Sequence, residues 1–123
     1  MTSVLLIDDD EYVVQLIAKV LTQKGYDVYC ASNGEEGLEI LSEKRNAIDI
    51  VVCDLLMPVK EGIETIMDIR RKRPRLPIIA ISGGGRNNRQ DILDAAQKLG
   101  ASAALPKPFR PKDLIELFDK LLT

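Results

Sequence analysis

Five short apolar runs alternate along the chain with longer segments of helical periodicity. The runs occupy residues 4–7, 28–31, 50–53, 78–81 and 103–105. Each is followed by a polar stretch, a pattern typical of strands that alternate with helices. The first, third and fourth runs are apolar at successive positions, as in central parallel strands covered on both faces. The second includes Asp27 and Tyr29 and the fifth is short and alanine-rich, so we expect these two strands at the edges.

The first predicted helix extends from residue 11 to residue 24. Asp9 or Asp10 is its expected N-cap, and Gly25 is its expected stop. Its predicted core face consists of apolar residues at helical spacing, namely Tyr12, Val13, Leu16, Ile17, Val20 and Leu21. We therefore expect this face to pack against the sheet.

Four further helices are predicted from the same periodicity. They lie at residues 32–46, 62–73, 88–100 and 111–122. Ser32 and Glu35 have the spacing of a capping box, which would start the first of these four helices. Pro74 ends the next one, and Pro111 begins the last.

Strands and helices in alternation predict an α/β fold with one open parallel sheet and helices on both faces. The chain has 123 residues, a usual size for one domain with one core, so residues 1–123 are expected to form a single domain. In such sheets ligands bind beyond the carboxyl ends of the strands. The residues that follow each apolar run are therefore the candidates for function.

Charge and composition exclude several classes of function. The formal net charge is -2, which gives no overall attraction to nucleic acid or to an acidic membrane surface. The apolar runs are too short to span a membrane, and the start of the chain lacks the pattern of a signal peptide. Cys30 and Cys53 lie in apolar runs, so we expect buried, reduced thiols and a cytoplasmic protein.

Polar residues with chemical potential follow four of the five runs. Asp8, Asp9 and Asp10 follow the first, and Asp54, Ser82 and Lys107 follow the third, fourth and fifth. Taken one at a time, they could be helix caps, loop residues or solvated charges. Together they would share one edge of the sheet, where the acids would repel each other unless a cation such as Mg²⁺ lies between them.

Four segments on this edge resemble the receiver domain of bacterial two-component response regulators, here like a single-domain chemotaxis regulator. They are residues 4–10 (VLLIDDD), 54–58 (DLLMP) with Gly62, 79–83 (IAISG) and 107–109 (KPF). The resemblance covers essentially the whole chain. It implies a flavodoxin-like doubly wound (βα)5 fold, with a five-stranded parallel sheet in the order 2-1-3-4-5.

The resemblance also implies a phosphoacceptor function. Asp54 would take a phosphoryl group from a phosphohistidine on a sensor histidine kinase or a histidine phosphotransfer protein. By similarity, Asp9 and Asp54 would bind Mg²⁺ directly, Asp8 would act through a water, and the backbone carbonyl of Leu56 would be the remaining protein ligand. The absence of histidine from this chain agrees with a donor on another protein. Signalling, rather than turnover of a separate substrate as an enzyme, is the expected role.

Ser82 and Lys107 have separate tasks in this interpretation. The lysine would supply a compact positive charge to the phosphoryl oxygens, and the serine hydroxyl would donate a hydrogen bond to another of them. By similarity, the peptide bond between Lys107 and Pro108 should be cis. The phosphorylated surface would act on a downstream protein or on an output domain absent from these residues.

Two features depart from the family pattern. Ala104 stands where an aromatic switch residue is usual, so we expect phosphorylation to rearrange mainly the loop of residues 82–89, which contains three successive glycines. Residues 100–104 contain none of the acids that pair across the dimer of winged-helix transcription factors, so that dimer is not expected.

Two other functions remain open from the sequence. A phosphatase of the haloacid dehalogenase type would use Asp8 as its nucleophile and Asp10 as its general acid. Two features argue against a phosphatase. The chain is short for that family, and the hypothesis gives no role to residues 54–58 (DLLMP). A receiver that acts only as a phosphorylation-independent interaction module is the second alternative, although such modules usually lack some of the site residues that are present here.

Overall fold

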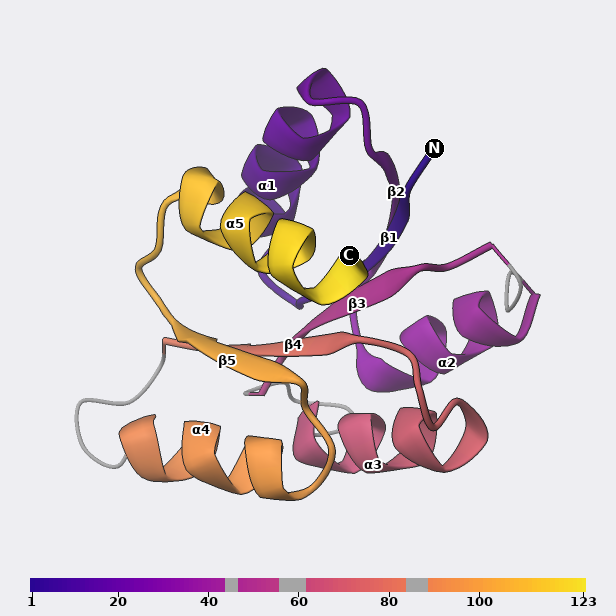
Figure 1. Ribbon diagram of the computed structural model, residues 1–123, viewed down its shortest axis with the longest axis vertical. Coiled ribbons are helices and arrows are strands. Elements are labelled where there is room, and N and C mark those ends of the chain that lie inside the picture. Colours follow the sequence, from indigo (N-terminus) through magenta and orange to yellow (C-terminus); the bar gives the residue numbers. More distant parts are fainter. Residues whose placement is uncertain (44–46, 56–61, 84–88) are drawn as a thin grey trace.

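The computed structural model describes residues 1–43, 47–55, 62–83 and 89–123, without the side chains of residues 89, 90 and 92. Five strands alternate with five helices in this part of the chain (Figure 1). The elements are β1 (Ser3–Ile7), α1 (Glu11–Gln23), β2 (Asp27–Ala31), α2 (Gly34–Glu43), β3 (Ile50–Asp54), α3 (Gly62–Lys72), β4 (Ile78–Ser82), α4 (Arg89–Lys98), β5 (Ala103–Pro106) and α5 (Pro111–Leu122). The alternation predicted from the apolar runs is confirmed.

All four strand pairings are parallel, and the strands lie in the order β2-β1-β3-β4-β5. This is the order that the family resemblance implies. β2 and β5 lie at the edges, as their mixed and alanine-rich sequences predict. The three central strands are buried at every residue. The chain therefore has the flavodoxin-like (βα)5 architecture.

Two hydrophobic clusters lie on opposite faces of the sheet, because successive strand residues point to opposite sides. Figure 1 shows α1 and α5 on one face and α2, α3 and α4 on the other. On the first face, apolar residues of the central strands pack with Ile17, Leu21, Leu114 and Phe118. On the second face, the strands pack with Leu41, Ile66, Ile69, Leu93 and Ala96. No helix in the described ranges has the length and apolar character needed to cross a membrane.

Several local predictions need correction. Asn33, rather than Ser32, caps α2: its Oδ1 accepts the Glu36 amide at 2.9 Å, and Ser32 Oγ donates to the Glu36 carboxylate at 2.9 Å. The N-cap of α2 thus lies one residue after the predicted Ser32. Asparagine and serine are both good N-caps, so composition does not fix the first residue of the helix.

Burial at the sheet edge also differs from the prediction. Tyr12 is 78% exposed and Leu16 is 54% exposed, although both belong to the predicted core face of α1. Cys30 is exposed too, whereas Cys53 is buried as expected. Both differences have a geometric cause, because α1 offers a wider apolar stripe than the sheet can cover, and β2 is an edge strand. Periodicity shows which side of an element is apolar but not how far its neighbour extends.

Arg70, in the last turn of α3, joins two parts of the chain. Its guanidinium donates to the Gly100 carbonyl at 3.0 Å through Nε and at 2.7 Å through Nη2. Through Nη1 it also donates to the carbonyls of Arg73 and Pro74, at 3.0 and 2.9 Å. The end of α3 and the turn after α4 are therefore held by one side chain. Gly100 has a φ of 138°, and a β-carbon there would press on Arg70.

Replacing Arg70 by methionine should lower the free energy of unfolding by about 2 kcal/mol, because three carbonyl oxygens lose a charged donor. Urea denaturation of the two proteins measures this difference. Arg71→Met is the matched control, because Arg71 is exposed and pairs with Asp68 on the same helix at 3.3 Å. That control should change stability by less than about 0.5 kcal/mol. Equal losses in both variants would contradict a joining role for Arg70.

Candidate functional site

Four strand ends bring the predicted site residues to one edge of the sheet. Asp8 and Asp9 follow β1, Asp54 ends β3, Ser82 ends β4, and Lys107 follows β5. The strands are parallel and paired in register, with Ile7 opposite Cys53 and Asp54 opposite Ile81, so their carboxyl ends meet. The edge predicted from the apolar runs is therefore where the structure places these five residues.

The acids form a compact cluster. One carboxylate oxygen each from Asp8, Asp9 and Asp54 lies within 4.8 Å of the other two. The Asp8 side chain has no solvent exposure and that of Asp54 has 6%, whereas Asp9 is exposed. Hard oxygen ligands at this spacing, with one side open to solvent, suit a divalent cation such as Mg²⁺ that keeps several waters.

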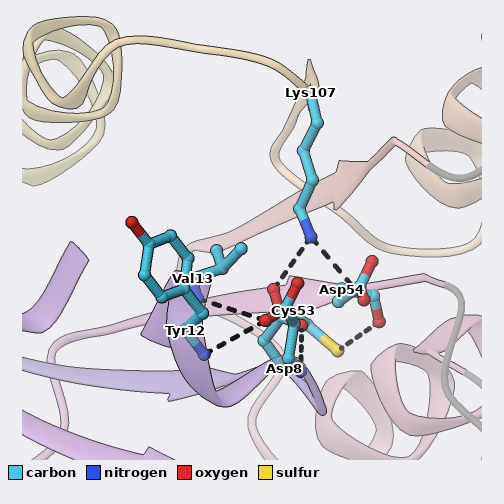
Figure 2. A network of polar contacts seen from close by, with 7 residues as sticks. Asp8, Tyr12, Val13, Cys53, Asp54 and Lys107 are labelled. Atoms are coloured by element: carbon cyan, nitrogen blue, oxygen red, sulfur yellow. Dashed lines mark hydrogen bonds and ion pairs between the residues drawn. The ribbon is translucent and has the colours of Figure 1, made fainter. Parts of the chain in front are cut away.

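Lys107 supplies positive charge to this cluster. Figure 2 shows its side chain reaching toward both buried acids, with Nζ 3.0 Å from Asp8 Oδ2 and 3.9 Å from Asp54 Oδ2. A buried carboxylate without a partner would be very costly, so the Asp8 pair makes this burial possible. One ammonium cannot balance three carboxylates, however. The cluster keeps an excess of negative charge that favours binding of a cation.

Asp10 has a different role from its two neighbours. Its Oδ1 accepts the amides of Tyr12 at 3.1 Å and Val13 at 3.3 Å, which makes it the N-cap of α1. Its own amide donates to Asp8 Oδ1 at 3.0 Å. The start of α1 and the buried acid are thus held together. Of the two caps proposed from the sequence, Asp10 is confirmed.

Ser82 is fully buried at the end of β4, and its hydroxyl has no hydrogen-bond partner among the described residues. Its backbone carbonyl, in contrast, accepts the Lys107 amide at 2.8 Å. Buried hydroxyls are nearly always hydrogen-bonded, and an unsatisfied one costs about 1–3 kcal/mol. Such a group at a site edge is therefore a donor available to a ligand.

Two glycines position the site, and the sequence analysis assigned neither of them this role. A β-carbon at Gly83 would collide with the Lys107 side chain, and one at Gly62 would collide with the Asp54 carbonyl. Gly62 appeared only as a motif residue and helix start, and Gly83 only as part of a glycine run. Both glycines lie beside the end of a strand. This position is the sequence feature that could have indicated their role, since glycine lets a backbone or a side chain approach closely.

Cys53 is a buried neighbour of the cluster without a chemical task in it. Its thiol donates to the Asp54 carbonyl at 3.4 Å (Figure 2). Burial raises the pKa of this thiol far above its usual range, and the charges of Asp54 and Asp8 raise it further. The thiol therefore stays protonated and uncharged at physiological pH, as a packed residue would.

The remaining predicted site features have mixed outcomes. The Lys107–Pro108 peptide bond is cis, as the resemblance implies. Ala104 is half-buried and lies opposite Ala80 in the sheet, on the face covered by α4. Leu56, proposed as a carbonyl ligand, lies outside the described residues, as do residues 84–88 of the loop proposed to rearrange.

The family model for the response regulator receiver domain matches residues 4–119. CpxR of Escherichia coli K12, a transcriptional regulatory protein, is 33% identical over 115 residues, covering 94% of this chain and 47% of that protein. The response regulator SaeR of Staphylococcus aureus USA300 is 31% identical over 123 residues, covering 100% and 51%. The chain thus spans about half the length of these curated relatives.

Solved structures agree with the family match. A response regulator receiver domain protein from Clostridium thermocellum superposes with a TM-score of 0.92 at 32% identity, over 99% of this chain and 94% of that one. The chemotaxis protein CheY4 of Vibrio cholerae gives a TM-score of 0.87 at 27% identity, with 99% of both chains covered. Both likenesses extend over the sheet and all of its helices.

The unpaired hydroxyl of Ser82 leads to a prediction about stability. Ser82→Ala should raise the free energy of unfolding by about 1 kcal/mol, because it removes a buried donor that has no partner within residues 1–43, 47–55, 62–83 and 89–123. The matched control is Ser102→Ala, since Ser102 Oγ accepts the Ile78 amide at 3.1 Å. That variant should lose about 1 kcal/mol. A loss of stability in Ser82→Ala, measured by urea denaturation, would show that the hydroxyl is satisfied in the resting protein.

Proposed function

Because the chain belongs to the response regulator receiver domain family, we propose that it is a phosphoacceptor that carries its phosphoryl group on Asp54. One observation carries this proposal. The Asp54 carboxylate is buried at the same sheet edge as two further acids, the Lys107 ammonium and the unpaired Ser82 hydroxyl. A nucleophile, a cation site and two donors are the groups that phosphoryl transfer requires.

The proposed reaction is an in-line displacement at phosphorus. An Asp54 carboxylate oxygen forms the new bond to phosphorus, and the bond from phosphorus to the donor's histidine nitrogen breaks. The imidazole leaves with the electron pair of that bond, and the product is an aspartyl phosphate. Lys107 Nζ, already 3.9 Å from Asp54 Oδ2, places a positive charge where the phosphoryl oxygens arrive.

Asp8, Asp9 and Asp54 are the residues that would hold Mg²⁺, and their oxygen spacing and excess negative charge fit this ion. When bound, the metal neutralises charge on the phosphoryl group. The chain's own residues orient the reaction. Lys107 Nζ donates to one oxygen of the buried Asp8 beside the acceptor, and the Asp10 amide donates to the other oxygen.

The signal would begin at Ser82. Its hydroxyl has no hydrogen-bond partner in the part of the chain that the structure describes, and a phosphoryl oxygen on Asp54 would supply an acceptor. Ala104 has no side-chain rotamer with which to follow that movement. We therefore propose that the backbone after β4, residues 82–89, carries the change to the α4 face.

The phosphodonor would dock beside Lys107. Next to it lies a hollow of about 430 Å³ with a largely apolar lining, built from α1 and the β5–α5 connection. Leu16 is half-exposed on its α1 wall, and Phe109 lies on the opposite wall. A helix that presents the phosphohistidine and one apolar side chain would fit here. We propose this as the contact with a sensor histidine kinase or a histidine phosphotransfer protein, both in the cytoplasm.

The phosphatase alternative fits the geometry less well. Its nucleophile would be Asp8, which has no solvent exposure and is bound on one oxygen by Lys107 and on the other by the Asp10 amide. The proposed general acid, Asp10, is occupied as the cap of α1. We therefore propose a signalling acceptor and not an enzyme that turns over a separate substrate. Its output would be a downstream protein or a further domain, since the curated relatives are about twice as long.

Incubation with Mg²⁺ and a small acyl phosphate should add a single phosphoryl group, which peptide mapping by mass spectrometry should locate on Asp54. Asp54→Asn should abolish the label, because the amide is a poor nucleophile. Asp10→Asn is the matched control and should keep the label, since asparagine is an equally good helix cap.

Other outcomes of this experiment would contradict the proposal. A label on Asp8 that turns over rapidly would indicate the phosphatase. The absence of any label, from the small donor and from a phosphorylated histidine kinase, would indicate the phosphorylation-independent interaction module.

Mg²⁺ should stabilise the protein by binding only the folded state. At a concentration 100 times its dissociation constant, the gain would be about 2.7 kcal/mol, visible as a rise in Tm. Asp9→Asn should remove most of this gain with little effect on folding, because Asp9 is exposed. The proposed site would be wrong if Asp9→Asn responded to Mg²⁺ as the wild type does.

A further inference from the structure

A group of basic side chains lies at the edge of the sheet opposite Asp54, where the strands begin. Residues 70–75 contain five basic residues and no acidic one. Of these, Lys72, Arg73 and Arg75 line the surface at the end of α3 and the start of β4, and we call them the basic face. The chain has a net charge of -2, so the positive charge of the basic face is opposite in sign to that of the whole chain.

The basic face borders two hollows, and Lys72 and Arg73 line both of them. The first hollow, of about 370 Å³, lies between α3 and α2, whose Leu38 and Leu41 contribute its apolar part. The second, of about 480 Å³, continues past Pro74 and Arg75 to the start of β3. Together they form a surface with an apolar part next to a row of cations.

The helix end does not account for these cations. Basic residues are favoured in the last turn of a helix, where they interact with free carbonyls. Arg70 already performs this task, because its guanidinium binds the carbonyls of Arg73 and Pro74. The Asp49 carboxylate, which lines the second hollow, accepts the Ser3 amide at 2.8 Å. The charges of Lys72 and Arg75 are therefore in excess of what capping α3 requires.

We propose that the basic face binds an acidic peptide segment of another protein or domain, with an aliphatic side chain of that segment placed over Leu38 and Leu41. Carboxylates of the segment would meet Lys72 and Arg75, and the apolar part of the first hollow would fix its register. Among the described residues that line the two hollows there is no aromatic side chain on which bases could stack, and the acidic remainder of the chain repels a long polyanion. A short acidic peptide thus fits better than a nucleic acid.

The position of the basic face gives such binding a distinct use. Residues 47–49, before β3, and residues 73–77, before β4, lie at the amino ends of the strands, whereas Asp54 lies at a carboxyl end. A segment bound there would leave both the phosphoacceptor edge and the hollow beside Lys107 open. Binding should therefore be independent of phosphorylation, so the peptide would act as a constant tether and not as a reader of the signal.

The test uses the full chain and a short fluorescein-labelled peptide in which glutamates flank two leucines. Fluorescence anisotropy gives the affinity, and amide chemical shifts locate the contact by NMR. The double variant Lys72→Glu with Arg75→Glu should weaken binding at least about tenfold, since two attractions become repulsions. Lys19→Glu with Lys112→Glu makes the same change in net charge at exposed positions on α1 and α5, and it should weaken binding less than about twofold.

The apolar contact is tested separately. Replacing both leucines of the peptide by serine should weaken binding about fivefold or more, and Ser42→Glu on the wall of the first hollow should do the same. Thr22→Glu, an exposed position near the end of α1, is the control for Ser42→Glu. Asp54→Asn should bind as the wild type does, which keeps this result independent of the phosphoacceptor function.

Four results would overturn the proposal. One is equal weakening by the two charge-reversal pairs, and another is a set of chemical-shift changes away from residues 38–42 and 72–77. A third is tighter binding of a single-stranded oligonucleotide or of anionic phospholipid vesicles than of the peptide. The fourth is self-association in sedimentation that Lys72→Glu with Arg75→Glu abolishes, which would identify a second copy of the chain as the occupant.

Discussion

The burial of Asp8 is the constraint on which the site depends. A carboxylate without solvent exposure must be matched by opposite charge, and Lys107, 99 positions away in sequence, supplies it at 3.0 Å. This ion pair joins the first strand end to the last. The approach of Lys107 also needs Gly83, since a β-carbon there would occupy the space of the lysine side chain. Asp9 and Asp54 therefore lie close to Asp8, but the single positive charge of Lys107 does not balance all three acids. The excess negative charge suits a divalent cation.

Most of the fold could be predicted because parallel central strands have a strong signature. Residues 4–7, 50–53 and 78–81 are apolar at every position, and such runs occur where both faces of a sheet are covered. The carboxyl ends of these strands must share one edge, so the sequence alone predicts that Asp8, Asp54 and Ser82 lie together. The strand order came from the family resemblance, because local sequence does not encode which strands are neighbours.

The burial predictions were wrong where the exposure of a side chain depends on how far the neighbouring helix or strand extends over it. Tyr12 and Leu16 satisfy helical periodicity as well as Ile17 does, but α1 lies beside an edge strand and its stripe is only partly covered. Cys30 is exposed for the same reason. Gly62 and Gly83 were not assigned a positioning role because their importance lies in a tertiary approach. Only the folded structure shows which backbone or side chain a β-carbon at these glycines would collide with.

The packing under α4 is consistent with the proposal that a signal travels along the backbone. Across the sheet, Cys53 lies opposite Ala80, and Ala80 lies opposite Ala104. This row therefore contains only small side chains between β3 and the edge strand β5, and none of them has a bulky rotamer to exchange. Ser82 lies two residues beyond Ala80 on the same strand, and its carbonyl accepts the Lys107 amide. A hydroxyl that turns toward Asp54 would thus pull on β4 and on the β5 connection directly, through main-chain bonds, without a side-chain intermediary.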